Sequence, residues 1–136
     1  MALQKFWRVK IYVPVESAVG EEVLEQITKD TPTNVQDIVD VIGRIPGVGQ
    51  VGNYSDLYEL DFGFESYRAN EGASPRFGKI GETVNLRKAA MVTYLRYDCE
   101  PHFLELLVAE IKKVHPWEHP VIEFTECLLY VPSRGT

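Results

Sequence analysis

Four stretches of this chain predict β-strands, and in the first two apolar and polar residues alternate with a period of two. The first, "KFWRVKIYVP", ends at Pro14, since proline interrupts strand pairing. One side carries Trp7, Val9, Ile11 and Val13, and the other carries Arg8, Lys10 and Tyr12. From residue 54 the even positions form an apolar face on a long second strand: Tyr54, Tyr58, Leu60, Phe62 and Phe64.

The third stretch, "LRKAAMVTYLRYD", is apolar on both faces in its middle. This pattern is typical of a strand in the centre of a sheet. The fourth stretch, "VIEFTECLLYVP", lies close to the C-terminus and reads as the last strand.

Three segments show helical spacing. In "ESAVGEEVLEQITKD", Ser17 can cap a helix with apolar residues at 19, 23 and 27. In "TPTNVQDIVDVIGRIPG", Thr33 or Asn34 can cap a second helix, which Gly43 can end. The third and clearest helix is "CEPHFLELLVAEIKKVHP", which must stop near His115 because a following proline disfavours helical geometry.

The order of elements is β, α, a short α, β, loop, β, α, β. It predicts an α+β protein of the ferredoxin-like βαββαβ type, in which helices cover one face of a four-stranded antiparallel sheet. The 136 residues suit one domain, residues 1–136. The other sheet face, with Tyr12 and Tyr54, is expected to need a cover, most simply a second copy of the chain.

The net charge and the composition argue against some classes of binding partner and some cellular locations. Fourteen basic and twenty acidic residues give a net charge of −6, which argues against nucleic acid and anionic membranes as partners. No stretch approaches the length of a membrane span or a signal sequence. Cys99 and Cys127 are far apart and form no metal-binding spacing. We therefore expect a cytoplasmic protein with buried, reduced thiols.

The segment "EGASPRFGKIGE" is a candidate anion-binding loop. Glu71, Arg76 and Lys79 are its charged residues, and its glycines allow backbone amides to face outward. The alternative is a structural loop that packs on a neighbouring subunit. The stretch "GVGQVG" precedes a strand and not a helix, so it does not predict a nucleotide site.

Signs of catalysis are weak. The sequence contains neither GxSxG nor HExxH. Cys99 precedes a helix, which can lower a thiol pKa, but no histidine is evidently placed as its base. We expect the protein not to be an enzyme.

The segment "KKVHPWEHPVIEF" offers three possible ligands for a divalent transition metal, His115, Glu118 and His119. The letters H-x-x-E-H also occur in a class of zinc proteases, but Pro116 prevents the single helix which that chemistry needs. The alternative is a rigid corner between helix and strand, in which the prolines stiffen the turn and Trp117 packs.

Three segments in order, "VGNYSD", "NEGASPRFGKIG" and "HPWEHPVIEF", resemble the signature series of the PII-like domain inserted in Nif-three-like (YqfO-type) proteins. The "HPWEHP" corner also resembles that of CutA proteins, trimeric relatives associated with tolerance of divalent metals. The resemblance implies a homotrimer that binds small effectors in clefts between subunits. The ligand-binding residues expected from it and from the loop are Tyr54, Glu71, Arg76 and Lys79.

The resemblance thus implies a non-enzymatic, oligomeric PII/CutA-like protein that binds a small anionic effector or a partner protein in a regulatory role. The alternative is a CutA-like protein that binds copper or zinc. The sequence departs from the family in its long segment 31–46 and in Trp117 and Pro120. The hydrolase-like domain that flanks the insert in Nif-three-like proteins has no counterpart here, so its dinuclear-metal chemistry is not transferred.

Overall fold

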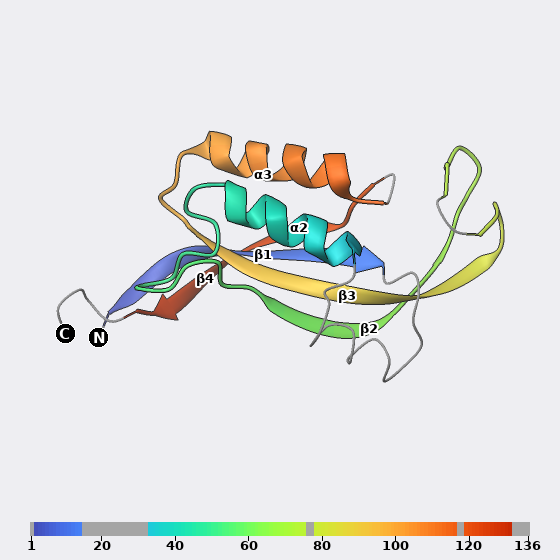
Figure 1. Ribbon diagram of the computed structural model, residues 1–136. Helices are drawn as coiled ribbons and strands as arrows, with labels where there is room; N and C mark the ends of the chain where they lie inside the picture. Colours follow the sequence, from blue (N-terminus) through green and yellow to red (C-terminus); the bar gives the residue numbers. More distant parts are fainter. Residues whose placement is uncertain (1, 15–32, 76–77, 117–118, 132–136) are drawn as a thin grey trace.

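The protein is an antiparallel sheet with two helices on one face (Figure 1). The structure, a computed structural model, describes residues 2–14, 33–75, 78–116 and 119–131. The predicted helix over residues 16–30 lies outside these ranges. The described elements are β1 (Leu3–Pro14), α2 (Thr33–Arg44), β2 (Glu59–Arg68), β3 (Thr83–Arg96), α3 (Pro101–Val114) and β4 (Ile122–Tyr130).

The strands of the described sheet lie in the order β2-β3-β1-β4, and every neighbouring pair is antiparallel. The predicted α+β architecture and the central position of β3 are therefore confirmed. The predicted four strands omit one further piece of strand pairing, an antiparallel bridge between Val51 and Tyr54 outside this sheet. Sequence alternation does not detect so short a pairing, because it spans too few residues to show a period.

The core lies between the sheet and the helices. On the sheet side, Val9 and Ile11 of β1 and Met91 of β3 are fully buried, and Ile11 pairs directly with Met91. The helices contribute residues at the spacing of one helical face. These buried helical residues are Val35, Ile38, Val41 and Ile42 of α2 and Leu107 and Ile111 of α3.

Strand β2 begins at Glu59, and the prediction that the strand starts near Tyr54 is wrong. The preceding segment turns repeatedly, since Gly49, Gly52 and Asp56 have φ values of 78°, 58° and 57°. A close approach also requires glycine at position 49, where a Cβ would lie 3.0 Å from the backbone nitrogen of Leu57. The Gly49 amide donates to Tyr94 O at 2.8 Å, so this segment continues along the edge of β3 beyond the end of β2.

The face of the sheet away from the helices is more charged than expected. The register places Lys10 of β1 between Val92 of β3 and Glu123 of β4. Tyr12 lies beneath two ammonium groups, with Lys88 Nζ 3.9 Å and Lys10 Nζ 5.0 Å from its ring centroid. The expectation that Tyr54 shares this face is wrong, because Tyr54 lies outside β2.

The sequence predicted reduced thiols at the two cysteines and no membrane-spanning stretch. Cys99 and Cys127 are free and half-buried. Burial raises the pKa of both thiols, and for Cys99 the nearby Asp98 adds to the effect. Within the described ranges, neither helix is long and apolar enough to cross a membrane.

Candidate ligand-binding loop and metal corner

Strands β2 and β3 project beyond the rest of the sheet as a two-stranded arm. β1 pairs with β3 only from Lys88 onward, whereas β2 pairs with β3 as far as Thr83. Residues 64–68 of β2, residues 83–87 of β3 and the loop between them form what we call the β2–β3 arm. In Figure 1 it extends well past the helices.

The loop at the end of the arm is closed by backbone hydrogen bonds. The amide of Gly81 donates to Ala69 O at 2.9 Å, and the amide of Glu82 donates to Lys79 O at 3.1 Å. Gly78 has φ 76°, and a Cβ on it would lie 2.2 Å from Cγ2 of Val84. Only glycine satisfies both requirements at this position.

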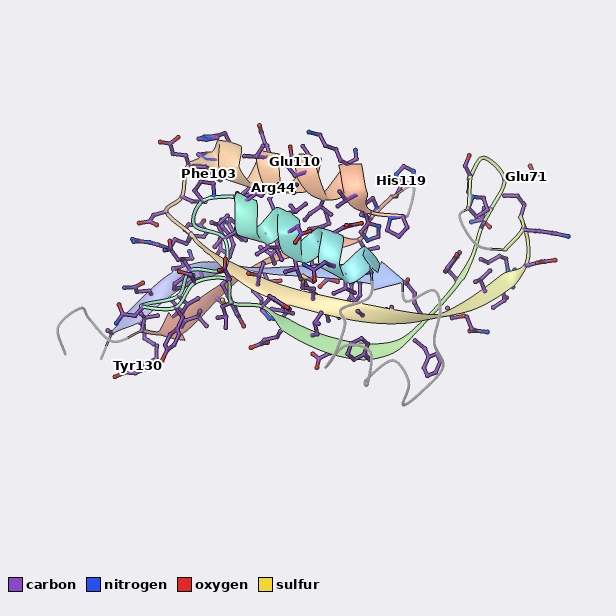
Figure 2. All side chains as sticks on the ribbon, in the orientation of Figure 1. Arg44, Glu71, Phe103, Glu110, His119 and Tyr130 are labelled. Atoms are coloured by element: carbon purple, nitrogen blue, oxygen red, sulfur yellow. The ribbon has the colours of Figure 1, made fainter. Side chains whose placement is uncertain are left out.

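The predicted ligand-binding residues do not all meet within one chain. Glu71 and Lys79 are exposed on the loop of the arm (Figure 2), and Arg76 lies outside the described residues. Tyr54 belongs to the segment that pairs with β3 near Tyr94. Thr83 and Tyr94 are eleven positions apart on extended β3, a span of about 35 Å. A site that contains Tyr54 as well as Lys79 would therefore need a second copy of the chain.

The second candidate site is the corner after α3. The helix ends where predicted, with His115 as its C-cap in extended geometry (φ −77°, ψ 135°). The His115 ring is buried, with 7% of its surface exposed, and its Nε2 donates to Tyr12 O at 2.5 Å. The amide of Tyr12 donates in turn to Val121 O at 3.2 Å. The corner thus ties the end of α3 to β1 and to the start of β4.

The burial of His115 and its hydrogen bond to Tyr12 determine the direction in which its pKa is shifted. Burial lowers the pKa of His115 below its ordinary value, and the hydrogen bond to Tyr12 opposes this shift without cancelling it. The imidazole is therefore neutral at pH 7, and its Nε2 is engaged by Tyr12 O. His119 is exposed (Figure 2), and Glu118 lies outside the described residues. The described residues contain no group of three or more His, Cys, Asp or Glu side chains that could hold a metal ion.

The structure also contains a groove that sequence patterns did not reveal. It has a volume of about 600 Å³ and lies between the C-terminal half of α2 and the segment that leads into β2. Val39 and Ile42 contribute its apolar lining, and Asp56 and Tyr58 line the side toward β2. The only sequence signal was the turn-forming pair Ser55 and Asp56, which gives no indication of its neighbours on α2.

Structural comparison shows that this fold is similar to part of a protein related to NIF3. A Bacillus cereus protein related to NIF3 is similar over 93% of this chain, with a TM-score of 0.63 and 16% identity. This chain covers 27% of that protein, so it spans about a quarter of its length. The expected likeness to a domain of Nif-three-like proteins is therefore confirmed for the fold.

CutA proteins are more distant matches. Pyrococcus horikoshii CutA has a TM-score of 0.44 and 15% identity, with 89% of this chain and 83% of that chain covered. The periplasmic divalent cation tolerance protein CutA from Archaeoglobus fulgidus has a TM-score of 0.42 and 14% identity, with 96% and 87% covered. No protein-family model and no curated protein matches the sequence.

Proposed function

We propose that this protein is a non-enzymatic, oligomeric binding protein of the PII/CutA-like type, which holds a small anionic effector at the loop of the β2–β3 arm. The single observation that carries the proposal is the arm itself. Within the described part of the chain, residues 83–87 of β3 pair with β2 on one edge and with no strand on the other. Unpaired strand edges of this kind are templates for pairing with another chain.

The positions of exposed apolar side chains support assembly through the arm. Leu60 of β2 pairs with the buried Met91, so Phe62 and Phe64 lie on the helix-side face. Phe64 is 69% exposed, beyond the cover of the helices. At the other end of the same face, Tyr130 of β4 pairs with Leu3 of β1, and it is 66% exposed.

Phe64 and Tyr130 lie at opposite ends of the sheet, on its two edge strands β2 and β4. A contact between the arm of one subunit and the β4 end of the next is heterologous, and such contacts form a ring when the rotation between neighbouring subunits closes. A trimer is the assembly that the family resemblance favours. In it the arm loop, with Lys79 and backbone turned by Gly78 and Gly81, would lie against a neighbouring subunit.

Light scattering coupled to gel filtration tests the assembly. We expect a mass of three times the 15.5 kDa of one chain. Phe64→Ser should shift the protein toward monomer, whereas Leu106→Ser on α3 should not, although Leu106 is 38% exposed. A monomeric wild-type protein at micromolar concentration would contradict the proposal.

Effector binding is tested separately on the trimer. Phosphate, citrate and ATP serve as anionic probes in a thermal-shift titration, and at least one should raise the melting temperature. Lys79→Gln should weaken that response, and Lys113→Gln on α3 is the control with the same loss of charge. An equal response from both variants would exclude the loop as the anion site.

A second candidate function, binding of copper or zinc, is favoured by one observation at the corner. Histidines that bind metals commonly donate their other ring N–H to a carbonyl or carboxylate, and His115 donates to Tyr12 O. We expect His119→Ala to abolish zinc or copper binding in calorimetry, while His102→Ala on α3 leaves it intact. Absence of heat with either metal on the wild-type protein would remove this candidate.

A further inference from the structure

The groove beside α2 has the composition of a ligand site distinct from the arm loop. Its volume of about 600 Å³ falls within the range of small-molecule pockets. Val39 and Ile42 supply apolar surface, and Gly43, with no side chain, leaves room between α2 and the opposite wall. The nearest atom to a Cβ at Gly43 would be Asp56 Oδ1, at 4.0 Å. Gly43 and Asp56 therefore face each other across the groove.

The polar residues of the groove differ in how far they are already engaged. Arg44 forms an ion pair with Glu110 of α3 at 3.7 Å, and Asp40 accepts a hydrogen bond from Gln36 Nε2 at 2.8 Å. The carboxylate of Asp56, by contrast, has no hydrogen bond or ion pair with the described residues. It is held on a backbone with φ 57°, and outliers of this kind are concentrated at binding sites.

Tyr58 adds a second recognition element beside Asp56. Its ring lines the groove and is half-buried, packed against the core. A cation over a tyrosine ring gains from the negative face of the aromatic system. A carboxylate next to an aromatic ring, above an apolar surface, is a combination that suits an ammonium group attached to a hydrocarbon body.

We propose that this groove binds a small primary amine with an apolar body, whose ammonium group contacts Asp56 and Tyr58 and whose hydrocarbon part lies on Val39 and Ile42. The charges favour a cation over an anion, because Asp40 and Asp56 bring two carboxylates and Glu110 already pairs with Arg44. The apolar lining favours an organic cation over a metal ion. This site does not depend on the anion site of the arm loop, which lies at the far end of β2.

The test is an NMR titration of the 15N-labelled full chain with phenethylammonium chloride. We expect saturable shifts centred on the amides of Gly43, Asp56 and Tyr58. Asp56→Asn should weaken binding at least about tenfold, the loss of one charge-assisted hydrogen bond. Asparagine tolerates the left-handed backbone at this position, so the fold should persist. Asp61→Asn, an exposed position on β2, is the control with the same change of charge.

Two further measurements exclude trivial explanations. The neutral analogue 2-phenylethanol should bind at least about tenfold more weakly than phenethylammonium. Gly43→Leu should block binding by filling the groove, while its melting temperature stays at or above that of the wild type, since leucine favours a helix more than glycine does. The proposal is overturned if Asp56→Asn binds like the Asp61→Asn control, or if the alcohol binds as well as the amine. Equal or tighter binding of Nα-acetyl-lysine methylamide would overturn the assignment to a small-molecule amine, because it would indicate that the groove holds the lysine side chain of a protein partner.

Discussion

The hydroxyl of Thr93 holds the segment before β2 onto the sheet, and replacing it by valine should loosen that segment. Thr93 is completely buried, and its Oγ1 donates to Leu57 O at 2.8 Å. β2 pairs with β3 no further than Glu59 and Val92. This bond therefore continues the attachment to β3 where the strand pairing stops.

The magnitude follows from what Thr93→Val removes. Valine keeps the shape of the side chain, so no cavity forms, but the carbonyl of Leu57 loses its donor. An unsatisfied buried acceptor costs about 1–3 kcal/mol. Leu57 is half-buried, so water can partly replace the bond. We therefore expect the free energy of unfolding to fall by about 1–2 kcal/mol, which corresponds to a loss of roughly 4–8 °C in melting temperature.

Urea unfolding at one fixed protein concentration measures this loss, because assembly makes apparent stability depend on concentration. Thr125→Val, at an exposed position on β4, is the matched control and should change stability by less than about 0.5 kcal/mol. Hydrogen exchange gives the local effect. The amides of Gly49 and Leu57, which donate to Tyr94 O and Gly49 O, should exchange faster in Thr93→Val only. If the two valine variants are equally stable and equally protected, Thr93 does not anchor this segment.

Two other outcomes follow from the backbone and from His115. Gly78→Ala should lower the free energy of unfolding by more than about 1 kcal/mol in urea, because its Cβ would clash with Val84. Gly72→Ala is the control and should lower it less, since φ is also positive there (95°) but no atom lies within 4 Å. Equal losses of stability in the two variants would contradict the clash. The free energy of unfolding should decrease as the pH falls below about 6.5, since the unfolded chain then binds a proton that His115, with its lowered pKa, does not. His115→Gln should weaken this pH dependence of the free energy of unfolding, measured from pH 8 to 5. His102→Gln, at an exposed position, is the control and should preserve it. A wild-type pH profile in both variants would show that His115 does not cause the pH dependence.

The sequence predicted those elements whose pattern extends over many residues. The alternation in β1 and the three- and four-residue spacing in α3 each reflect one buried face, so periodicity was sufficient to identify them. It also predicted the end of α3, because the geometry imposed by Pro116 is local. In the same way, the two-sided apolar stretch around Met91 indicated a central strand before any pairing was known.

The sequence could not predict which segments that are distant along the chain lie side by side in the fold. The even-numbered apolar residues from Tyr54 onward predict one continuous strand, but the left-handed backbone at Gly52 and Asp56 breaks the period. Tyr54 therefore lies apart from Lys79, with which it was grouped as a ligand-binding residue. The groove next to α2 was missed for a related reason, since Gly43 and Asp56 face each other only after β2 has paired with β3.

The charged face of the sheet changes the reason for expecting a second subunit. A cover was expected there because Tyr12 was predicted to lie on an apolar surface, yet Lys10 and Lys88 both lie over its ring. A tyrosine flanked by two ammonium groups, on a face with Glu123 at its edge, is compatible with water. The exposed apolar side chains on which the proposed assembly rests lie on the other face, at Phe64 of the arm and Tyr130 of β4. Assembly through these two ends would bury apolar side chains and satisfy unpaired strand edges in one step, which contact between two charged faces would not achieve.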